Sequence, residues 1–156
     1  MTTASDLLQR HIQTLVADNA QWQALIADDL VWELPYGPGI GDPARLVGRE
    51  EVMRHVTWFL GAVENVRFFD LQVHPFADPD AAVAEVKAEA FIKPIQRTYR
   101  ADTAYLSSGV CRVLRAAGGK ITFLLEYFDP TRAAKAARGQ IADVCGIHAP
   151  ELTEMF

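Results

Sequence analysis

The sequence predicts a single α+β domain, with helices on its N-terminal side followed by a run of long β-strands. Apolar residues recur at helical spacing over the first 26 residues and again over residues 48–60. Residues 81–92 instead alternate small apolar residues with charged ones, as a strand with one wet face does. Gly118-Gly119 separates two further strand-like runs and is typical of a hairpin turn. Because helices followed by strands are typical of the α+β class, we expect a curved antiparallel sheet wrapped around the early helices.

Three helices are expected before residue 61. Ser5 or Asp6 can cap the first helix, and His11 lies beside its apolar stripe, where we interpret it as a hydrogen-bonded edge residue. A second, short helix has an apolar face made of Trp22, Leu25 and Ile26. The third begins at Gly48 and runs to about Leu60, with an apolar face made of Val52, His55, Val56, Phe59 and Leu60.

Five strands are expected, over residues 30–36, 66–76, 81–92, 99–115 and 120–128. Residues 37–43 form a loop rich in Gly and Pro that lacks the Gly-Lys-Ser/Thr ending of a phosphate-binding loop. We interpret this loop as a flap over a cavity mouth or as a simple connection. Pro130 suits the first turn of a last helix, which Gly139 ends. The domain therefore covers residues 1–156, with a core at about residues 5–138 and a tail at residues 139–156.

Length, composition and charge exclude several classes of protein. Half of the 156 residues are hydrophobic, which is enough for one sizeable core. The net charge of −5 and the scattered basic residues argue against nucleic acid or an anionic membrane as a partner. No apolar run approaches the ~20 residues of a membrane span, and no signal peptide is recognisable, so we expect a cytoplasmic protein. Cys111 and Cys145 fit no metal-ligand spacing, and we expect neither a metal nor a cofactor.

Glu126 lies in the most apolar strand-like run of the chain, at residues 121–128. A carboxylate in apolar surroundings is paired, protonated or functional, and burial raises its pKa toward the range of a general acid or base. The alternative is an exposed glutamate at a strand end. His55 lies on the apolar face of the third helix, where a catalytic role competes with that of a core histidine holding one hydrogen bond.

The order of elements resembles the nuclear-transport-factor-2-like (NTF2-like), or SnoaL-like, cone with an internal pocket. The resemblance covers the chain to about Ala137 and includes the Gly48-Arg-Glu-Glu helix start and the Gly-Lys-Ile hairpin before Glu-Tyr-Phe-Asp-Pro130. Two segments resemble the phenazine biosynthesis A/B family. These are Gly48-Arg-Glu-Glu-Val-Met-Arg-His55 with Trp58 three residues on, and Leu125-Glu126-Tyr-Phe-Asp-Pro130. In that family a helix His and a strand Glu perform acid–base chemistry that forms an imine, which implies His55 and Glu126 here.

We therefore expect an enzyme that uses cofactor-free acid–base chemistry on a small hydrophobic or aromatic molecule. Imine formation, isomerisation, as in ketosteroid isomerase-like proteins, dehydration and cyclisation all fit this chemistry. Glu126 and His55 are the expected catalytic residues, and Glu33 is a possible third group. The expected substrate-binding residues are Trp32, Tyr36, Trp58, Tyr105 and Arg49. Arg45 competes with Arg49 for a substrate carboxylate, and either arginine can instead be a surface residue.

The competing hypothesis is a non-catalytic member of the same fold, either a small-ligand binder or a dimerisation module. In both cases we expect a homodimer through the outer sheet face, because the strands between residues 81 and 128 are longer and more apolar than one cone interior can absorb.

Overall fold

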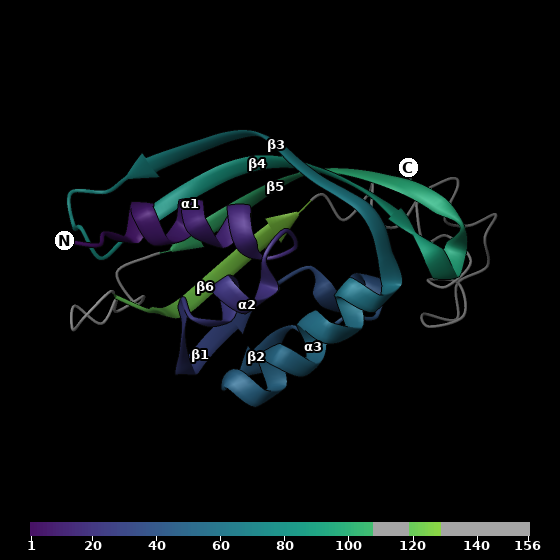
Figure 1. The fold of residues 1–156 in the computed structure, drawn as a ribbon, viewed down its shortest axis with the longest axis horizontal. Helices are drawn as coiled ribbons and strands as arrows, with labels where there is room; N and C mark the ends of the chain where they lie inside the picture. The colour runs from purple at the N-terminus through teal and green to yellow at the C-terminus, as the bar shows by residue number, and fades with distance from the viewer. Residues whose placement is uncertain (108–118, 129–156) are drawn as a thin grey trace.

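In the described part of the chain, three α-helices lie on the concave side of a curved six-stranded sheet, which arches over α1 with α2 and α3 below it (Figure 1). The structure is a computed structural model that describes residues 1–107 and 119–128, with Ile40, Ile95 and residues 100–107 described by their backbone alone. The helices are α1 (Ala4–Thr14), α2 (Asn19–Gln23) and α3 (Arg49–Ala62). The strands are β1 (Ile26–Glu33), β2 (Arg45–Val47), β3 (Val63–Pro75), β4 (Ala82–Ile92), β5 (Arg97–Ser107) and β6 (Ile121–Phe128).

The sheet has the strand order β2-β1-β6-β5-β4-β3. The pairs from β3 to β6 are antiparallel, as the sequence predicts for residues 66–128, and β1 and β2 are antiparallel as well. The β1–β6 pair is parallel, and the predicted curved antiparallel sheet did not include this pair. Parallel neighbours need a long connection, and β1 and β6 are joined through almost the whole chain.

Local backbone conformation and capping hydrogen bonds define where the two longer helices, α1 and α3, begin. Thr3, rather than the expected Ser5 or Asp6, caps α1: its hydroxyl accepts a hydrogen bond from the Asp6 N–H at 3.2 Å, and the Asp6 carboxylate accepts one from the Thr3 N–H at 2.8 Å. Gly48 precedes α3 with a φ of 84°, a conformation that glycine adopts without strain. The Glu51 carboxylate accepts a hydrogen bond from the Val47 N–H at 2.7 Å and joins the first turn of α3 to β2.

The core lies between the helices and the concave face of the sheet. On β4, Ala82, Ala84 and Val86 are buried while Glu85 and Lys87 are exposed, which confirms the predicted alternation. The buried cluster takes residues from every helix and from β1, β2, β4 and β6, among them Leu7, Leu8, Trp22, Leu30, Trp32, Leu46, Val52, Val56 and Leu124. No described helix combines the length and the apolar character that crossing a membrane requires.

The outer face of β3 and β4 is charged. Three cross-strand ion pairs lie there, Arg67–Glu89 at 3.5 Å, Lys87–Asp70 at 2.8 Å and His74–Glu85 at 3.2 Å.

The helix expected over residues 130–138, the tail at 139–156, Gly118 and both cysteines lie outside the described residues.

Candidate functional site

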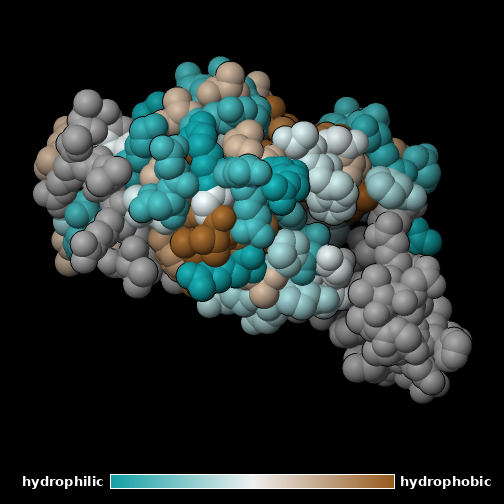
Figure 2. Space-filling view, turned by 90° about the horizontal axis from the view of Figure 1, so that it is seen from below, coloured by the Kyte–Doolittle hydropathy of each residue, from teal (hydrophilic) through white to brown (hydrophobic). Residues whose placement is uncertain are grey.

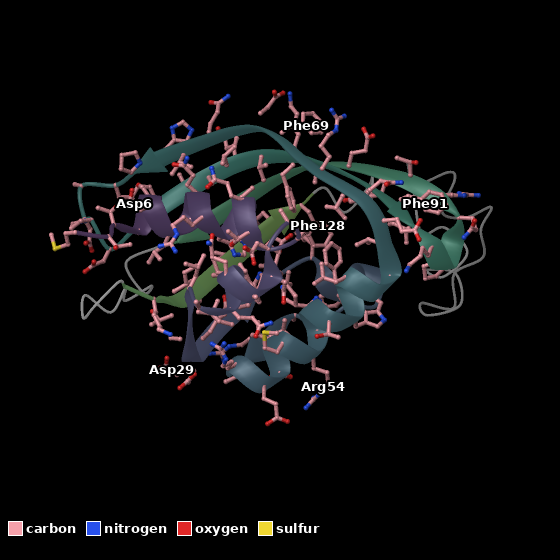
Figure 3. All side chains as sticks on the ribbon, viewed as in Figure 1. Asp6, Asp29, Arg54, Phe69, Phe91 and Phe128 are labelled. Carbon is pink, nitrogen blue, oxygen red and sulfur yellow. The ribbon has the colours of Figure 1, made fainter. Side chains whose placement is uncertain are left out.

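Glu126 lies on the concave side of β6. Side chains alternate along a strand, and Leu124, two residues earlier, is completely buried in the core. Leu124 also pairs with Trp32 of β1, another core residue. Glu126 and Phe128 therefore face the same side as Leu124, and both are half-buried. Figure 3 shows the Phe128 side chain inside the arch of the sheet, toward α3. This part of β6 thus brings a half-buried carboxylate next to aromatic surface.

His55 lies on α3, which buries Val52 and Val56 against the core. Its ring is half-buried, and the centroids of the His55 and Trp58 rings are 5.8 Å apart. Trp58 itself is mostly exposed, at 59%. The positive charge of His55 also acts on the Asp42 carboxyl.

Asp42 is a charged group near His55 that the sequence-based reasoning did not select. It is half-buried in the loop between β1 and β2. Burial raises the pKa of the Asp42 carboxyl, and the positive charge of His55 opposes part of this rise. The signal available in the sequence was the run of glycines before Asp42, which predicts a loop but does not show what the loop covers.

Tyr36 joins the same loop to the end of β6. Its ring lies 5.9 Å from the Tyr127 ring and 6.3 Å from the Phe128 ring, measured between centroids. The Tyr36 side chain remains 44% exposed. Tyr36 therefore contacts the end of β6 through its ring, and the Asp42 carboxyl of the same loop interacts electrostatically with His55 of α3.

The other expected binding residues occupy different environments. Trp32 is buried in the core, with its ring 5.6 Å from that of His11 and 6.4 Å from that of Trp22. The Arg49 guanidinium donates to the carbonyl oxygens of Ile26 at 3.1 Å and Gln23 at 2.9 Å. The Cα of Tyr105 pairs with that of Glu126 across β5 and β6, and the Tyr105 side chain lies outside the described part of the chain. A binding role for these three residues stays a prediction.

Glu33 and Arg45 lie on the opposite side of the sheet from Trp32. The two residues are paired in the β1–β2 register, and their side chains form an ion pair of 3.7 Å. Glu33 directly follows the buried Trp32 in β1, and consecutive residues of a strand face opposite sides of the sheet, so Glu33 faces outward. Within the described ranges, no group of three or more His, Cys, Asp or Glu side chains is arranged to hold a metal ion.

Comparison with known proteins places the chain in a family. A family model for the SnoaL-like domain matches residues 8–124. An uncharacterized PhzA/B-like protein of Pseudomonas aeruginosa is 28% identical over 137 residues, which cover 87% of this chain and 91% of that protein. Among solved structures, a putative isomerase from Bacillus subtilis has a TM-score of 0.71 at 20% identity, covering 87% of this chain and 93% of that one.

A second solved structure is a hypothetical protein from Catenulispora acidiphila with a ketosteroid isomerase-like fold, in complex with trimethylamine. It has a TM-score of 0.63 at 19% identity, covering 96% of this chain and 98% of that one. The NTF2-like fold that the resemblance implied is confirmed by an NTF2-like protein from Exiguobacterium, which has a TM-score of 0.61 at 15% identity, covering 79% of this chain and 98% of that one. The match of the family model over most of the chain is decisive: the chain belongs to the SnoaL-like domain family.

Proposed function

We propose that this protein is a small-molecule enzyme that uses cofactor-free acid–base chemistry, with Glu126 and His55 as its catalytic residues. The observation that carries the proposal is the half-buried carboxylate of Glu126 on the concave face of β6, between the fully buried Leu124 and the aromatic Phe128. Carboxyl groups placed among apolar side chains are candidates for acid–base catalysis. Membership of the SnoaL-like family and the similarity to a PhzA/B-like protein support the same chemistry.

The arrangement suits proton transfer to and from a carbonyl compound. Glu126 in its protonated form donates to the carbonyl oxygen while neutral His55 removes a proton from the adjacent carbon or from an attacking amine. In the first case, protonated His55 gives its proton to a different carbon while Glu126 recovers its proton from the enol oxygen, which gives an isomer. In the second case, protonated His55 gives its proton to the hydroxyl of the carbinolamine, water leaves, and Glu126 takes the remaining proton from the nitrogen, which gives an imine. Both residues end in their starting states, so the cycle requires no further reactant. Imine formation is the reaction that the resemblance to the phenazine biosynthesis A/B family implies, and one structural neighbour is described as a putative isomerase.

The substrate class that fits is a small hydrophobic or aromatic ketone. Phe128 faces the same side of β6 as Glu126, and the centroid of its ring lies 6.3 Å from that of Tyr36, which remains 44% exposed. Such rings provide flat apolar contacts to a cyclic ligand. Trp58, beside His55, offers a further exposed aromatic surface.

The test is proton exchange at the α-carbon of a cyclic enone such as 2-cyclohexenone, followed by NMR in D₂O with catalytic amounts of protein. We expect Glu126→Gln to lower the exchange rate by roughly 10²–10⁴-fold, the usual range for a positioned acid or base, and His55→Gln to act in the same direction. Glu50→Gln is the matched control, because Glu50 is an exposed carboxylate on α3 paired with Arg54 at 3.1 Å.

Two results would count against the proposal. Exchange at the same rate in Glu126→Gln and in the wild-type protein would remove Glu126 from the chemistry. Saturable binding of the enone with no exchange above background would favour the alternative of a non-catalytic ligand-binding module of the same fold.

A further inference from the structure

Tyr36 lies in a loop between β1 and β2 whose shape is fixed by backbone hydrogen bonds. The Leu34 N–H donates to the Ala44 carbonyl at 2.8 Å, and the Gly37 N–H donates to the Leu34 carbonyl at 2.9 Å. The Asp42 N–H then donates to the Gly37 carbonyl at 2.9 Å. Because these bonds close the loop around Tyr36, its backbone lies in a compact turn with a defined position.

The backbone next to Tyr36 crosses the far side of the loop at close range. Gly37 is buried, and a Cβ atom placed on it would lie 2.6 Å from the Pro43 carbonyl oxygen. Gly41 has a φ of 85°, in the left-handed region that L side chains rarely adopt. The two glycines therefore allow the crossing that holds Tyr36 at the end of β1.

The Tyr36 ring contacts two consecutive residues of β6. Its centroid lies 5.9 Å from that of Tyr127 and 6.3 Å from that of Phe128, within the usual range of aromatic pairs. Consecutive strand residues point to opposite sides of a sheet, so a ring in contact with both lies over the end of the strand. On the Phe128 side, this end belongs to the concave face that carries Glu126. Since Tyr36 remains 44% exposed, one part of it covers the end of that face and the other part meets water.

Two apolar groups bound the space beside Glu126 along β6. Leu124, which is completely buried, lies two residues before it, and Phe128, with Tyr36 against it, lies two residues after it. Two residues along a strand correspond to about 7 Å, which is roughly the length of one six-membered ring. A ligand whose carbonyl oxygen reaches Glu126 can therefore extend along β6 by one ring before it meets Phe128 and Tyr36.

We propose that Tyr36 limits the size of the ligand, so that the site accepts a ketone with one six-membered ring and excludes a ketone with two fused rings. The placing of the ligand carbonyl at Glu126 rests on the proposed function. Tyr36 acts through the volume of its ring and takes no part in proton transfer. Removing the ring uncovers the side of Phe128 that Tyr36 contacts and gives a second ligand ring room at the end of the concave face.

The test compares two ketones that differ by one ring. 1-Tetralone is 2-cyclohexenone with a benzene ring fused across its C=C bond, so both compounds share the carbonyl group and an exchangeable α-carbon. NMR titration gives the Kd of each ketone, and exchange in D₂O gives kcat/KM. In the wild-type protein we expect a preference for 2-cyclohexenone of at least about 10-fold in kcat/KM, as for other sites that discriminate by size, with Kd values that differ in the same direction. Tyr36→Ala should remove this preference, mainly by lowering the Kd of 1-tetralone.

Three further variants serve as controls. Tyr36→Phe keeps the ring and should keep the preference. Phe76→Ala removes an aromatic side chain of similar exposure, 43%, which follows β3 at the far edge of the sheet from β1 and β2, and it should also keep the preference. Thermal midpoints show which variants are folded. If Tyr36→Ala does not fold, Tyr36→Leu takes its place, because leucine keeps an apolar contact with Phe128 but is smaller than a tyrosine ring.

The size limit fails if the wild-type protein binds 1-tetralone as tightly as 2-cyclohexenone, or binds neither. It also fails if a folded Tyr36→Ala variant keeps the wild-type preference. Failure of the proposed function gives a different result. If Tyr36→Ala lowers the Kd of 1-tetralone while Glu126→Gln exchanges 2-cyclohexenone at the wild-type rate, the size limit stands and the acid–base role of Glu126 does not.

Discussion

His11 and Trp22 form a hydrogen-bonded pair deep in the core. The Trp22 indole N–H donates to His11 Nδ1 at 2.9 Å, so the neutral His11 ring carries its proton on Nε2. The sequence predicted His11 as a hydrogen-bonded edge residue. The structure instead buries it completely, because its ring is enclosed by Trp22 and Trp32. Trp32 is equally buried, yet its indole N–H has no hydrogen-bond partner among the described residues. Trp22 and Trp32 lie in one buried cluster and thus differ in whether the indole N–H donates a hydrogen bond.

This difference predicts unequal effects of two similar substitutions. Trp22→Phe leaves the buried His11 Nδ1 without a donor, so beyond the loss of packing it should lower the free energy of unfolding by a further 1–3 kcal/mol, approximately. Trp32→Phe removes a similar volume but also an N–H that lacks a partner, so we expect a clearly smaller loss. Urea unfolding followed by circular dichroism measures both. Equal losses would mean that the hydrogen bond contributes nothing to stability.

His11 also predicts how stability depends on pH. Burial lowers the pKa of His11 from 6.5 to about 3. Below pH 6.5 the unfolded chain binds a proton at this position while the folded chain does not, so the stability contributed by neutral His11 is present above pH 6.5 and is lost as the pH falls toward 3. The slope reaches about 1.4 kcal/mol per pH unit. Urea midpoints between pH 7.5 and 5.0 should fall less steeply in His11→Gln. The same slope in both proteins would contradict the burial of His11.

Polar residues within apolar segments could be selected from the sequence as candidate functional residues. Polar residues in loops, which become buried only in the folded protein, could not. Glu126 was visible as a carboxylate in an apolar run and His55 as a histidine on a helix face. Asp42 lies in a loop of Gly and Pro whose local pattern is that of any exposed turn. Its burial arises only in the folded chain, and no spacing in the sequence carries that information.

At the scale of elements, long periodic segments were predicted closely and short ones were not. The expected strand at residues 81–92 is β4 (Ala82–Ile92), and the expected helix at 48–60 is α3 (Arg49–Ala62). The three-residue strand β2 was not predicted, since three residues carry no period. β1 begins at Ile26 because an irregularity in its register lets Asp28 and Asp29 face solvent within the strand, although the pair was interpreted as a helix end. Figure 3 shows Asp29 pointing away from the molecule.

Arg49 joins three elements, and this predicts a structural effect of its replacement. Its two hydrogen bonds to the carbonyls of Gln23 and Ile26 tie the start of α3 to the junction between α2 and β1. A lysine ammonium group cannot reproduce the two hydrogen bonds that the planar guanidinium donates. Arg49→Lys should therefore lower the free energy of unfolding by about 1–3 kcal/mol. Arg54→Lys on the exposed face of α3 is the control and should have little effect. An unchanged stability with weakened binding of a carboxylate-bearing ligand would instead favour Arg49 as a substrate-binding residue.

At the scale of the whole molecule, the order of helices and strands was sufficient to predict the fold class, because each segment can bury its apolar face in few ways. The parallel contact between β1 and β6 was beyond such reasoning, since it joins the two segments that lie farthest apart in the sheet-forming part of the chain. This contact matters for the site. It places Leu124 beside Trp32 and so orients Glu126 toward the helices.

The outer face of the sheet is charged on β3 and β4, whereas on β2, β1 and β6 it carries a group of apolar side chains next to the Glu33–Arg45 ion pair. The three ion pairs occupy β3 and β4, and exposed pairs of this kind are stable in water without a partner. On the other half, Val47, Val31 and Phe123 lie side by side across β2, β1 and β6. Cross-strand neighbours share a face, and Val47 is 54% exposed. Figure 2, a view from below, shows a compact hydrophobic patch on the side where β1 and β2 lie, surrounded by hydrophilic surface.

We therefore expect a homodimer that uses the β2–β1–β6 half of the outer face. The patch would otherwise stay in contact with water, and burying it against a second copy removes that apolar area twice in one symmetric contact. Light scattering at micromolar concentration should give twice the mass of the chain. Val47→Glu places a charge at the centre of the contact and should shift the protein to monomer. Gln72→Glu adds the same charge to the exposed β3 surface and should leave the dimer intact. A monomeric wild-type protein, or dissociation by Gln72→Glu and not by Val47→Glu, would rule out this interface.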